Sequence, residues 1–260
     1  MSKRFEDSVI IITGAGSGLG RAAALRVASE GAKLTLVDIS ENGMKETKDL
    51  IEKDFPETEL LMVKADVSQE ADVKNYVDKT VDKYGKITGF FNNAGIEGKQ
   101  NPTEDFGSDE FRKVISINLD GVFFGMKHVL KVMKEQKHGY IVNTASVGGI
   151  RGVGNQSGYA AAKHGVVGLT RNSAVEYGEY GISINAIAPG AIMTAMVEGS
   201  LKQIDEENWE AVGEEFVKAN PSKRFGKPEE VAALTAYLLS EADFVNGAVI
   251  TIDGGQSYKY

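Results

Sequence analysis

The sequence contains no cysteine, which excludes disulfide bonds, thiolate metal sites and a cysteine nucleophile. Histidine is nearly as scarce. The three histidines, His128, His138 and His164, do not have the spacing of zinc ligands. We therefore expect no metal site, and any chemistry must come from other side chains.

The chain also lacks an excess of positive charge and any long apolar run. Lys and Arg total 29 against 37 Asp and Glu, a net charge of −8, so neither nucleic acid nor an anionic membrane is expected as a partner. No run approaches ~20 apolar residues, and residues 1–6 lack the apolar core of a secretory signal. These observations predict a soluble cytoplasmic protein. A chain of 260 residues is long enough for a single α/β domain, and we expect one over residues 1–260.

A glycine-rich turn lies between an expected strand and an expected helix. The β-branched run 9–12 is typical of a buried parallel strand, residues 13–20 read Thr-Gly-Ala-Gly-Ser-Gly-Leu-Gly, and residues 21–29 are helical in pattern. Glycines let a backbone approach a ligand closely, and free amides at a helix start favour negative charge. The pattern predicts a nucleotide diphosphate site, with an ordinary strand–helix turn as the alternative. The expected contacts are Gly14, Ser17, Gly18, Leu19 and Gly20.

Asp38 ends the second expected strand, residues 33–38, and lies 18 residues beyond Gly20. A carboxylate at this position can accept hydrogen bonds from a ribose diol, and it would repel a 2′-phosphate. No Lys or Arg lies between Gly14 and Gly20 or directly after Asp38 to neutralise such a phosphate. The sequence therefore predicts NAD(H) rather than NADP(H), although an acidic strand end can also be a solvated turn residue.

Tyr159 and Lys163 are four residues apart, a spacing that places both side chains on one face of a helix. An ammonium beside a phenol favours the phenolate, so we expect Lys163 to lower the pKa of Tyr159 from its reference value near ~10. A buried Tyr beside a surface Lys is the alternative. Ser146 ends an expected strand over residues 139–146, and ligands of open parallel sheets bind beyond the carboxyl ends of strands.

Taken in order, these features resemble the short-chain dehydrogenase/reductase superfamily, and the resemblance spans nearly the whole chain. The matching motifs are Thr-Gly-x-x-x-Gly-x-Gly at 13–20, Asn-Asn-Ala-Gly at 92–95 and Pro-Gly at 189–190, with Asn118, Ser146, Tyr159 and Lys163 matching the catalytic tetrad. Strand-like and helix-like patterns alternate throughout, which fits this family. We expect an α/β Rossmann-type fold, a doubly wound, seven-stranded parallel sheet with helices on both faces, in a homotetramer.

The resemblance implies a role for each tetrad residue. Tyr159 is the expected general acid/base, and Ser146 the residue that orients the substrate oxygen. Lys163 is expected to stabilise the phenolate and bind the nicotinamide ribose, and Asn118 to hold a water that connects Lys163 to solvent. Asn118 lies in an expected long helix from about residue 110 to 136, where an interhelical hydrogen bond or a helix bulge would also explain a polar amide.

The remaining cofactor contacts are also implied by the resemblance. Asp66 is expected near the adenine, although a helix N-cap would explain Asp66 equally well. Thr194 resembles the anchor of the nicotinamide carboxamide. The full further set is Asp66, Val67, Asn92, Ala94, Gly95, Pro189, Gly190, Ile192 and Thr194.

Residues 96–102, the loop 147–156 and the tail 253–257 are similar to family members that act on a cyclic diketone. Between residues 190 and 228 the repeating pattern loosens, which indicates a lid over a substrate pocket, or an amphipathic helix pair packed on the body. We expect a small cyclic or bulky uncharged carbonyl substrate. The expected substrate contacts are Ser146, Tyr159, Glu97, Gly148, Gln156, Met193, Met196 and Trp209.

The sequence thus predicts an NAD(H)-dependent enzyme that interconverts a secondary alcohol and a ketone. One alternative is an NADPH-dependent 3-oxoacyl-carrier-protein reductase, which Asp38 and the acidic chain disfavour. Another is a non-catalytic nucleotide-sensing protein. The presence of all four tetrad residues weighs against it, because a binding protein needs no proton relay.

Overall fold

A seven-stranded parallel sheet forms the centre of the computed structural model, which describes residues 3–218 and 220–258. Its strand order is β3-β2-β1-β4-β5-β6-β7, so the chain starts in the middle, runs to one edge and then crosses to build the other half. The expected fold is confirmed. The strands are β1 Val9–Thr13, β2 Lys33–Asp38, β3 Leu60–Lys64, β4 Gly89–Asn92, β5 Gly139–Thr144, β6 Ile182–Pro189 and β7 Val249–Ile252.

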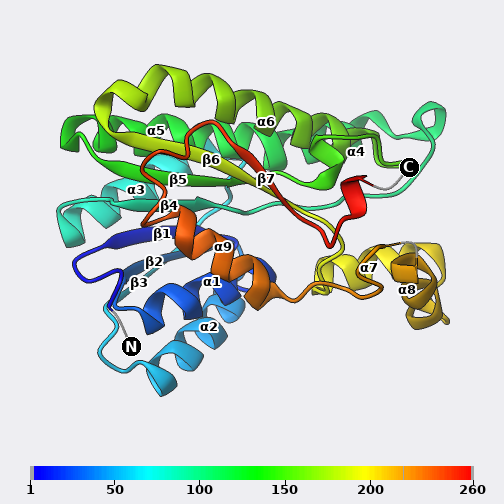
Figure 1. The fold of residues 1–260 in the computed structure, drawn as a ribbon, viewed down its shortest axis with the longest axis horizontal. Coiled ribbons are helices and arrows are strands. Elements are labelled where there is room, and N and C mark those ends of the chain that lie inside the picture. Colours follow the sequence, from blue (N-terminus) through cyan, green and yellow to red (C-terminus); the bar gives the residue numbers. More distant parts are fainter. Residues whose placement is uncertain (1–2, 219, 259–260) are drawn as a thin grey trace.

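Helices cover both faces of the sheet (Figure 1). On one face α1, α2 and α9 enclose one apolar core, and on the other α3, α5 and α6 enclose a second. The helices of the described residues are α1 Gly18–Ser29, α2 Glu41–Asp54, α3 Glu70–Tyr84, α4 Ser108–Ile115, α5 Gly121–Gln136, α6 Ser157–Tyr177, α7 Ala195–Ile204, α8 Trp209–Lys218 and α9 Pro228–Leu238. Among these residues, no helix is long and apolar enough to cross a membrane.

The central strands have no polar face because helices lie on both sides of them. Every residue of β1, β4, β5 and β6 is buried, as expected for parallel strands made of continuous apolar runs. The strand order reverses between β1 and β4. In such sheets this is the point where a crevice opens at the carboxyl ends of the strands, and there ligands bind.

Two expected elements differ from the structure. The strand expected over residues 139–146 ends at Thr144, so Ser146 lies in the turn beyond it. The long helix expected from about 110 to 136 is divided by a π-helical turn, Ser116–Asp120. The wide turn contains Asn118, whose side-chain amide both accepts from and donates to the backbone of Ile96, so a helix bulge is present at Asn118 and its expected role toward Lys163 stays a prediction.

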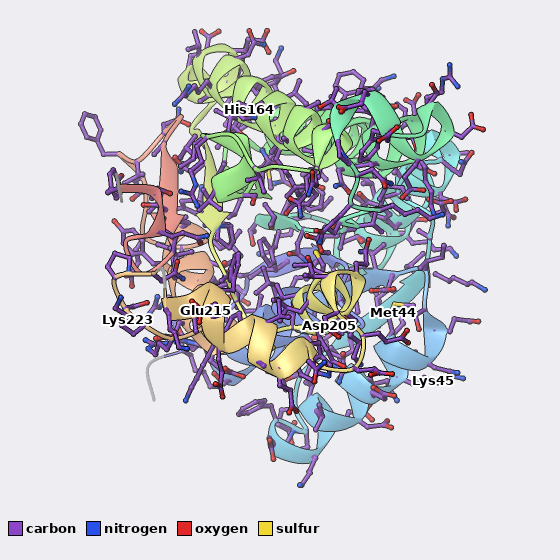
Figure 2. All side chains as sticks on the ribbon, turned by 90° about the vertical axis from the view of Figure 1, so that its right-hand side faces the viewer. Met44, Lys45, His164, Asp205, Glu215 and Lys223 are labelled. Atoms are coloured by element: carbon purple, nitrogen blue, oxygen red, sulfur yellow. The ribbon has the colours of Figure 1, made fainter. Side chains whose placement is uncertain are left out.

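The segment that follows β6 forms the helix pair α7 and α8, which projects beyond the sheet layers (Figure 1). Figure 2 looks at this end of the molecule, with Asp205 between the two helices and Glu215 on α8. The carboxylate of Asp205 accepts hydrogen bonds from the backbone N–H groups of Glu207 and Asn208 at 3.1 and 3.0 Å. Hydrogen bonds from Asn208, followed by that from Glu207, lower the pKa of the Asp205 carboxyl. Residues 190–228 therefore contain a defined helix pair with a fixed turn.

Candidate active site

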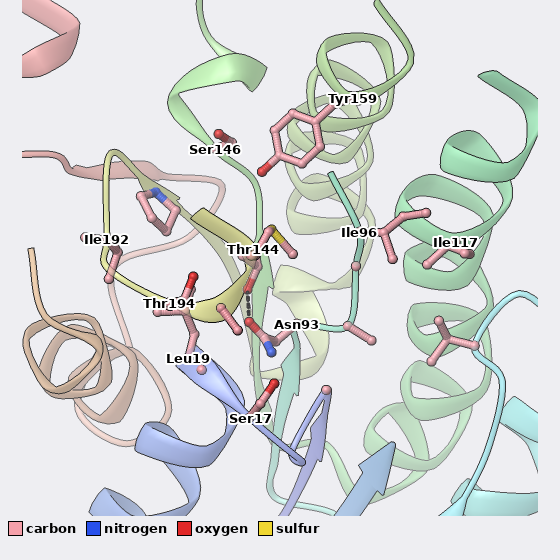
Figure 3. A pocket seen from close by; sticks show the side chains of 18 of the residues that line it. Ser17, Leu19, Asn93, Ile96, Ile117, Thr144, Ser146, Tyr159, Ile192 and Thr194 are labelled. Carbon is pink, nitrogen blue, oxygen red and sulfur yellow. Dashed lines mark hydrogen bonds between the residues drawn. The ribbon is translucent and has the colours of Figure 1, made fainter. Parts of the chain in front are cut away.

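A cavity of about 390 Å³ opens at the carboxyl ends of the strands, at the reversal of strand order. Its walls come from the glycine-rich turn, the residues after β2, β3, β4, β5 and β6, and the start of α7. Figure 3 shows Ser17 and Leu19 at one end of it and Tyr159 and Ser146 at the other. The cavity is therefore long enough to bring the nucleotide-type turn and the catalytic-type residues into one site.

The glycine-rich turn requires its glycines. Gly14 and Gly18 have φ angles of +67° and +52°, in the left-handed region that other residues rarely adopt. A Cβ on Gly20 would lie 2.0 Å from the carbonyl oxygen of Gly14, so only glycine lets α1 pack against the turn. Gly20 does not line the cavity and contributes through this packing, which differs from the contact expected from the sequence. The resulting cradle of backbone, with the N-terminus of α1 behind it, fits a diphosphate group.

Asp38 lines the same end of the cavity. One carboxylate oxygen accepts a hydrogen bond from the N–H of Gly16 and the other from the N–H of Ser40, both at 2.8 Å. Each oxygen keeps a further acceptor position, which suits the hydroxyl groups of a ribose. Arg21 is a nearby cation that the sequence argument did not consider, but its guanidinium bonds Glu46 at 2.7 Å and does not line the cavity.

Ser146 and Tyr159 form the opposite end of the cavity. The Ser146 hydroxyl accepts a hydrogen bond from the N–H of Gly148 at 3.0 Å and keeps its own proton as a donor, which in this structure is directed to the Tyr159 oxygen. Figure 3 shows the phenol of Tyr159 pointing into the cavity beside Ser146. This pair can hold a substrate oxygen between a hydrogen-bond donor and a proton donor.

Burial dominates the proton affinity of the phenol. It raises the pKa of Tyr159 to about 12, and the negative charge of Glu97 adds to the rise, while a hydrogen bond with Ser146 opposes it. The direction is the opposite of the fall expected from the Lys163 charge, because desolvation of the phenolate is the largest cause. Tyr159 is held as a protonated acid at neutral pH.

Lys163 is buried beneath this pair, with only 3% of its surface exposed. Its ammonium donates a hydrogen bond to the carbonyl oxygen of Thr144 at 2.7 Å and lies 5.6 Å from the centre of the Tyr159 ring. Burial lowers the pKa of Lys163 to about 8. The alternative interpretation, a buried Tyr beside a surface Lys, is therefore excluded.

Asn118 is fully buried and lies behind the same end of the site. Its amide donates to the carbonyl oxygen of Ile96 at 2.6 Å and accepts from the N–H of Ile96 at 2.8 Å. A Cβ on Gly95 would lie 3.0 Å from the Asn118 oxygen and 3.6 Å from the Lys163 ammonium, so both side chains converge on Gly95. The side chain of Asn118 thus fixes the segment after β4.

Most of the expected cofactor contacts line the cavity. They are Gly14, Ser17, Gly18, Leu19, Asp38, Asp66, Val67, Ala94, Gly95, Tyr159, Lys163, Pro189, Gly190, Ile192 and Thr194. Asn92 does not. Its amide donates to the carbonyl oxygen of Val122 at 2.9 Å and to the side chain of Asn143 at 3.1 Å, and the next residue, Asn93, faces the cavity instead.

The expected substrate contacts are only partly brought together. Met196 lines the cavity with Ser146 and Tyr159, whereas the other five lie outside its walls: Glu97, Gly148, Gln156, Met193 and Trp209. Trp209 lies at the start of α8, where the Lys202 ammonium lies 5.4 Å from its ring. Gly148 lies behind the catalytic pair, since a Cβ there would be 3.6 Å from both Ser146 and Tyr159.

Several wall residues were not found from the sequence. These are Ile39, Ala65, Asn93, Ile96, Ile117, Thr144, Ala145, Ala195 and Val197. Most of them directly precede or follow a motif residue in the sequence, and this position next to a motif could have been used to predict them. Among the described residues, no group of three or more His, Cys, Asp or Glu side chains is arranged to hold a metal ion.

Comparison with known proteins gives a family and several close relatives. The model of a family described as enoyl-(acyl carrier protein) reductase matches residues 14–257. Levodione reductase of Leifsonia aquatica is 64% identical over 99% of this chain and 97% of the relative. Cyclohexanol dehydrogenase of Acinetobacter sp. (strain SE19) is 39% identical over all of this chain and 98% of the relative.

Solved structures agree with these sequence matches. A crystal structure of levodione reductase superposes with a TM-score of 0.97 at 63% identity, covering 98% of this chain and all of the other. The structure of NAD⁺-bound xylitol dehydrogenase superposes with a TM-score of 0.90 at 33% identity, covering 96% of this chain and 99% of the other. The fold is therefore shared over nearly the full length of these chains.

Proposed function

Since the chain belongs to the short-chain dehydrogenase/reductase family of alcohol and ketone oxidoreductases, we propose that it interconverts a secondary alcohol and a small cyclic ketone with NAD(H). The observation that carries the proposal is one cavity that contains the glycine-rich turn and Asp38 at one end, and Ser146, Tyr159 and Lys163 at the other. A protein that only sensed a nucleotide would need the first end and not the second.

The residues of the cavity fit a dinucleotide. The cradle at Gly14 and Gly18 suits the diphosphate, and Asp38, with acceptor positions directed at the cavity, suits a ribose diol without a 2′-phosphate. Lys163 would hold the nicotinamide ribose, and Thr194 the carboxamide. When bound, the nicotinamide supplies or accepts the hydride. The relative with NAD⁺ bound in its solved structure supports the choice of NAD(H).

The chain's own residues move the proton. In reduction Tyr159 donates its phenolic proton to the carbonyl oxygen, and in oxidation the phenolate accepts the proton of the alcohol. Ser146 donates a hydrogen bond to the same oxygen and so fixes its position. The Lys163 ammonium stabilises the phenolate that reduction leaves behind, and Asn118 holds the segment at Gly95 and Ile96 against this end of the cavity. Acid–base help of this kind contributes about 10²–10⁴-fold to a rate.

The substrate class follows from the walls around the catalytic pair and from the relatives. Ile96, Ile117, Met196 and Val197 give this part of the cavity apolar walls, which suit an uncharged ring. The relatives named for levodione and cyclohexanol act on six-membered ring compounds, and they match this chain over nearly its full length. By its family we also propose that the protein assembles as a homotetramer.

A nicotinamide absorbance assay tests the proposal. Purified protein is given NADH or NADPH with levodione, cyclohexanone, butanone or an acetoacetyl thioester, and Tyr159→Phe is the matched control that removes only the phenolic hydroxyl. We expect NADH-dependent turnover of the cyclic ketones and a loss of at least about 10²-fold in Tyr159→Phe. Turnover of the thioester with NADPH alone would contradict the proposal and favour the carrier-protein reductase.

The pH dependence of the same assay tests the role of Tyr159. With the pKa of Tyr159 raised to about 12, the acid form prevails at neutral pH and the base form increases as pH rises. Cyclohexanol oxidation should therefore increase steadily between about pH 7 and 10, while cyclohexanone reduction should not increase. An oxidation rate independent of pH over this range would exclude the phenol as the titrating base.

A further inference from the structure

The segment that follows Gly95 is hydrogen-bonded to α7. The side chain of Gln203 bonds this segment twice, accepting from the N–H of Gln100 at 3.0 Å and donating to the carbonyl oxygen of Gly98 at 3.2 Å. The side chain of Gln100 returns to the helix and donates to the hydroxyl of Ser200 at 2.6 Å. Two glutamines thus join a loop and a helix that are 100 residues apart in sequence.

The same segment is bonded to the start of the helix that carries Tyr159. The carboxylate of Glu97 accepts hydrogen bonds from the Ser200 hydroxyl at 2.8 Å and from the side-chain amide of Gln156. Gln156 directly precedes α6, and Tyr159 lies three residues further on. A continuous series of hydrogen bonds therefore connects α7, through segment 96–101, to the first turn of α6. We call these five residues the α7 clasp: Glu97, Gln100, Gln156, Ser200 and Gln203.

The clasp lies outside the cavity but holds one of its walls. None of its five residues lines the cavity, whereas Met196 and Val197, in the first turn of the same helix, do. The helix pair α7 and α8 projects beyond the sheet layers (Figure 1), and among the described helices and strands α7 packs mainly on α8. Side chains held by several hydrogen bonds with neutral and charged partners can fix the distance of α7 from α6.

We propose that Gln100, Ser200 and Gln203 are positioning residues that set the width of the substrate end of the cavity, by holding α7 at a fixed distance from the helix that carries Tyr159. These three residues do not touch the substrate. The identity of the substrate rests on the proposed function, whereas the positioning role does not. A cavity whose walls are held at a fixed distance contacts a small ring on both sides, so loosening the clasp should weaken the binding of that ring more than it slows the chemical step.

Amide hydrogen exchange on the protein without cofactor or substrate tests the positioning role. Ser200→Ala and Gln203→Ala remove clasp hydrogen bonds and yet raise intrinsic helix propensity, so helix chemistry alone predicts slower exchange. We expect exchange of residues 195–204 to become about 3- to 10-fold faster in each variant, as the loss of one or two net hydrogen bonds implies. Gly199→Ala is the matched control, because a Cβ there meets only open space. It should exchange no faster than wild type. Unchanged exchange in the two clasp variants would overturn the proposal.

Kinetics with cyclohexanone and NADH give a second, separate readout. Ser200→Ala and Gln203→Ala should raise KM for cyclohexanone several-fold, whereas kcat and KM for NADH should stay within about twofold of wild type. Ser200→Thr keeps the hydroxyl, so its KM for cyclohexanone should equal that of wild type. A fall of kcat at constant KM would refute a positioning role. If wild type turns over no ketone while exchange of α7 responds as expected, the proposed function fails and the clasp stands.

Discussion

Replacing Lys163 by Met should make the protein more stable at neutral pH. The ammonium is 3% exposed and its one hydrogen bond in the described structure goes to the carbonyl oxygen of Thr144. Burial lowers the pKa of Lys163 from 10.5 to about 8. This fall corresponds to about 3 kcal/mol of destabilisation by the buried charge, at 1.36 kcal/mol for each factor of ten. Loss of the hydrogen bond from the charged ammonium to Thr144 costs about 1.5–3 kcal/mol, so Lys163→Met should gain up to about 1.5 kcal/mol.

The pH dependence gives the sign of this effect. Below about pH 8 Lys163 is charged in both the folded and the unfolded chain, so the cost of burying the charge is fully present. Between about pH 8 and 10.5 the unfolded chain binds more protons than the folded one, and wild-type stability rises relative to the variant. The difference between wild type and Lys163→Met should therefore be largest at pH 7 and vanish or reverse near pH 10.5.

Urea unfolding without cofactor measures both quantities. Wild type, Lys163→Met and the exposed-lysine control Lys131→Met are compared at one protein concentration and at several pH values between 7 and 10.5. The control should follow wild type throughout, and Lys163→Met should have no measurable ketone reductase activity. A Lys163→Met protein that is less stable than wild type at pH 7, or a difference that does not change with pH, would refute the argument.

Two further outcomes are expected. Asp38→Asn, which removes the negative charge that faces the ribose site, should lower the preference for NADH over NADPH by about 10-fold or more, as measured by kcat/KM with each cofactor; an unchanged ratio would exclude Asp38 as the discriminating residue. Gel filtration should give a mass near four times the chain mass of 27.9 kDa, and elution at 27.9 kDa would contradict the homotetramer.

The strands could be predicted because burial on both faces requires consecutive apolar residues, which are visible in the sequence. A strand covered on both faces needs a continuous apolar run, and β2 begins and ends where that run does, at Lys33 and Asp38. The error at β5 has the same origin. Apolar and small residues continue past Thr144 as far as Ser146, but the backbone turns there because the Ser146 hydroxyl caps the N–H of Gly148.

The two ends of the site differ in how far the sequence determines them. Gly14, Gly18, Tyr159 and Lys163 lie within single turns or one helix, so their spacing alone fixes their relation. The substrate end combines segments far apart in the chain, and its shape depends on how α7 packs. A bulky aromatic in that segment was therefore expected in the wall, whereas Trp209 lies on α8 outside the cavity.

The pKa of Tyr159 could not be predicted from the sequence spacing of Tyr159 and Lys163. From sequence only the neighbouring charge of Lys163 is visible, and it predicts a lowered pKa. The fold half-buries Tyr159 and puts the carboxylate of Glu97 within electrostatic range of its phenol, and both raise the pKa. Burial also lowers the pKa of Lys163, so the same loss of solvent keeps a proton on the phenol and destabilises the cation beside it. In the reaction that we propose, the resting site gives a proton to a carbonyl oxygen, and the phenolate that forms offsets the charge of Lys163. Loss of solvent is thus the common cause of two effects. It makes the charged Lys163 destabilise the folded protein, and it keeps Tyr159 in the acid form.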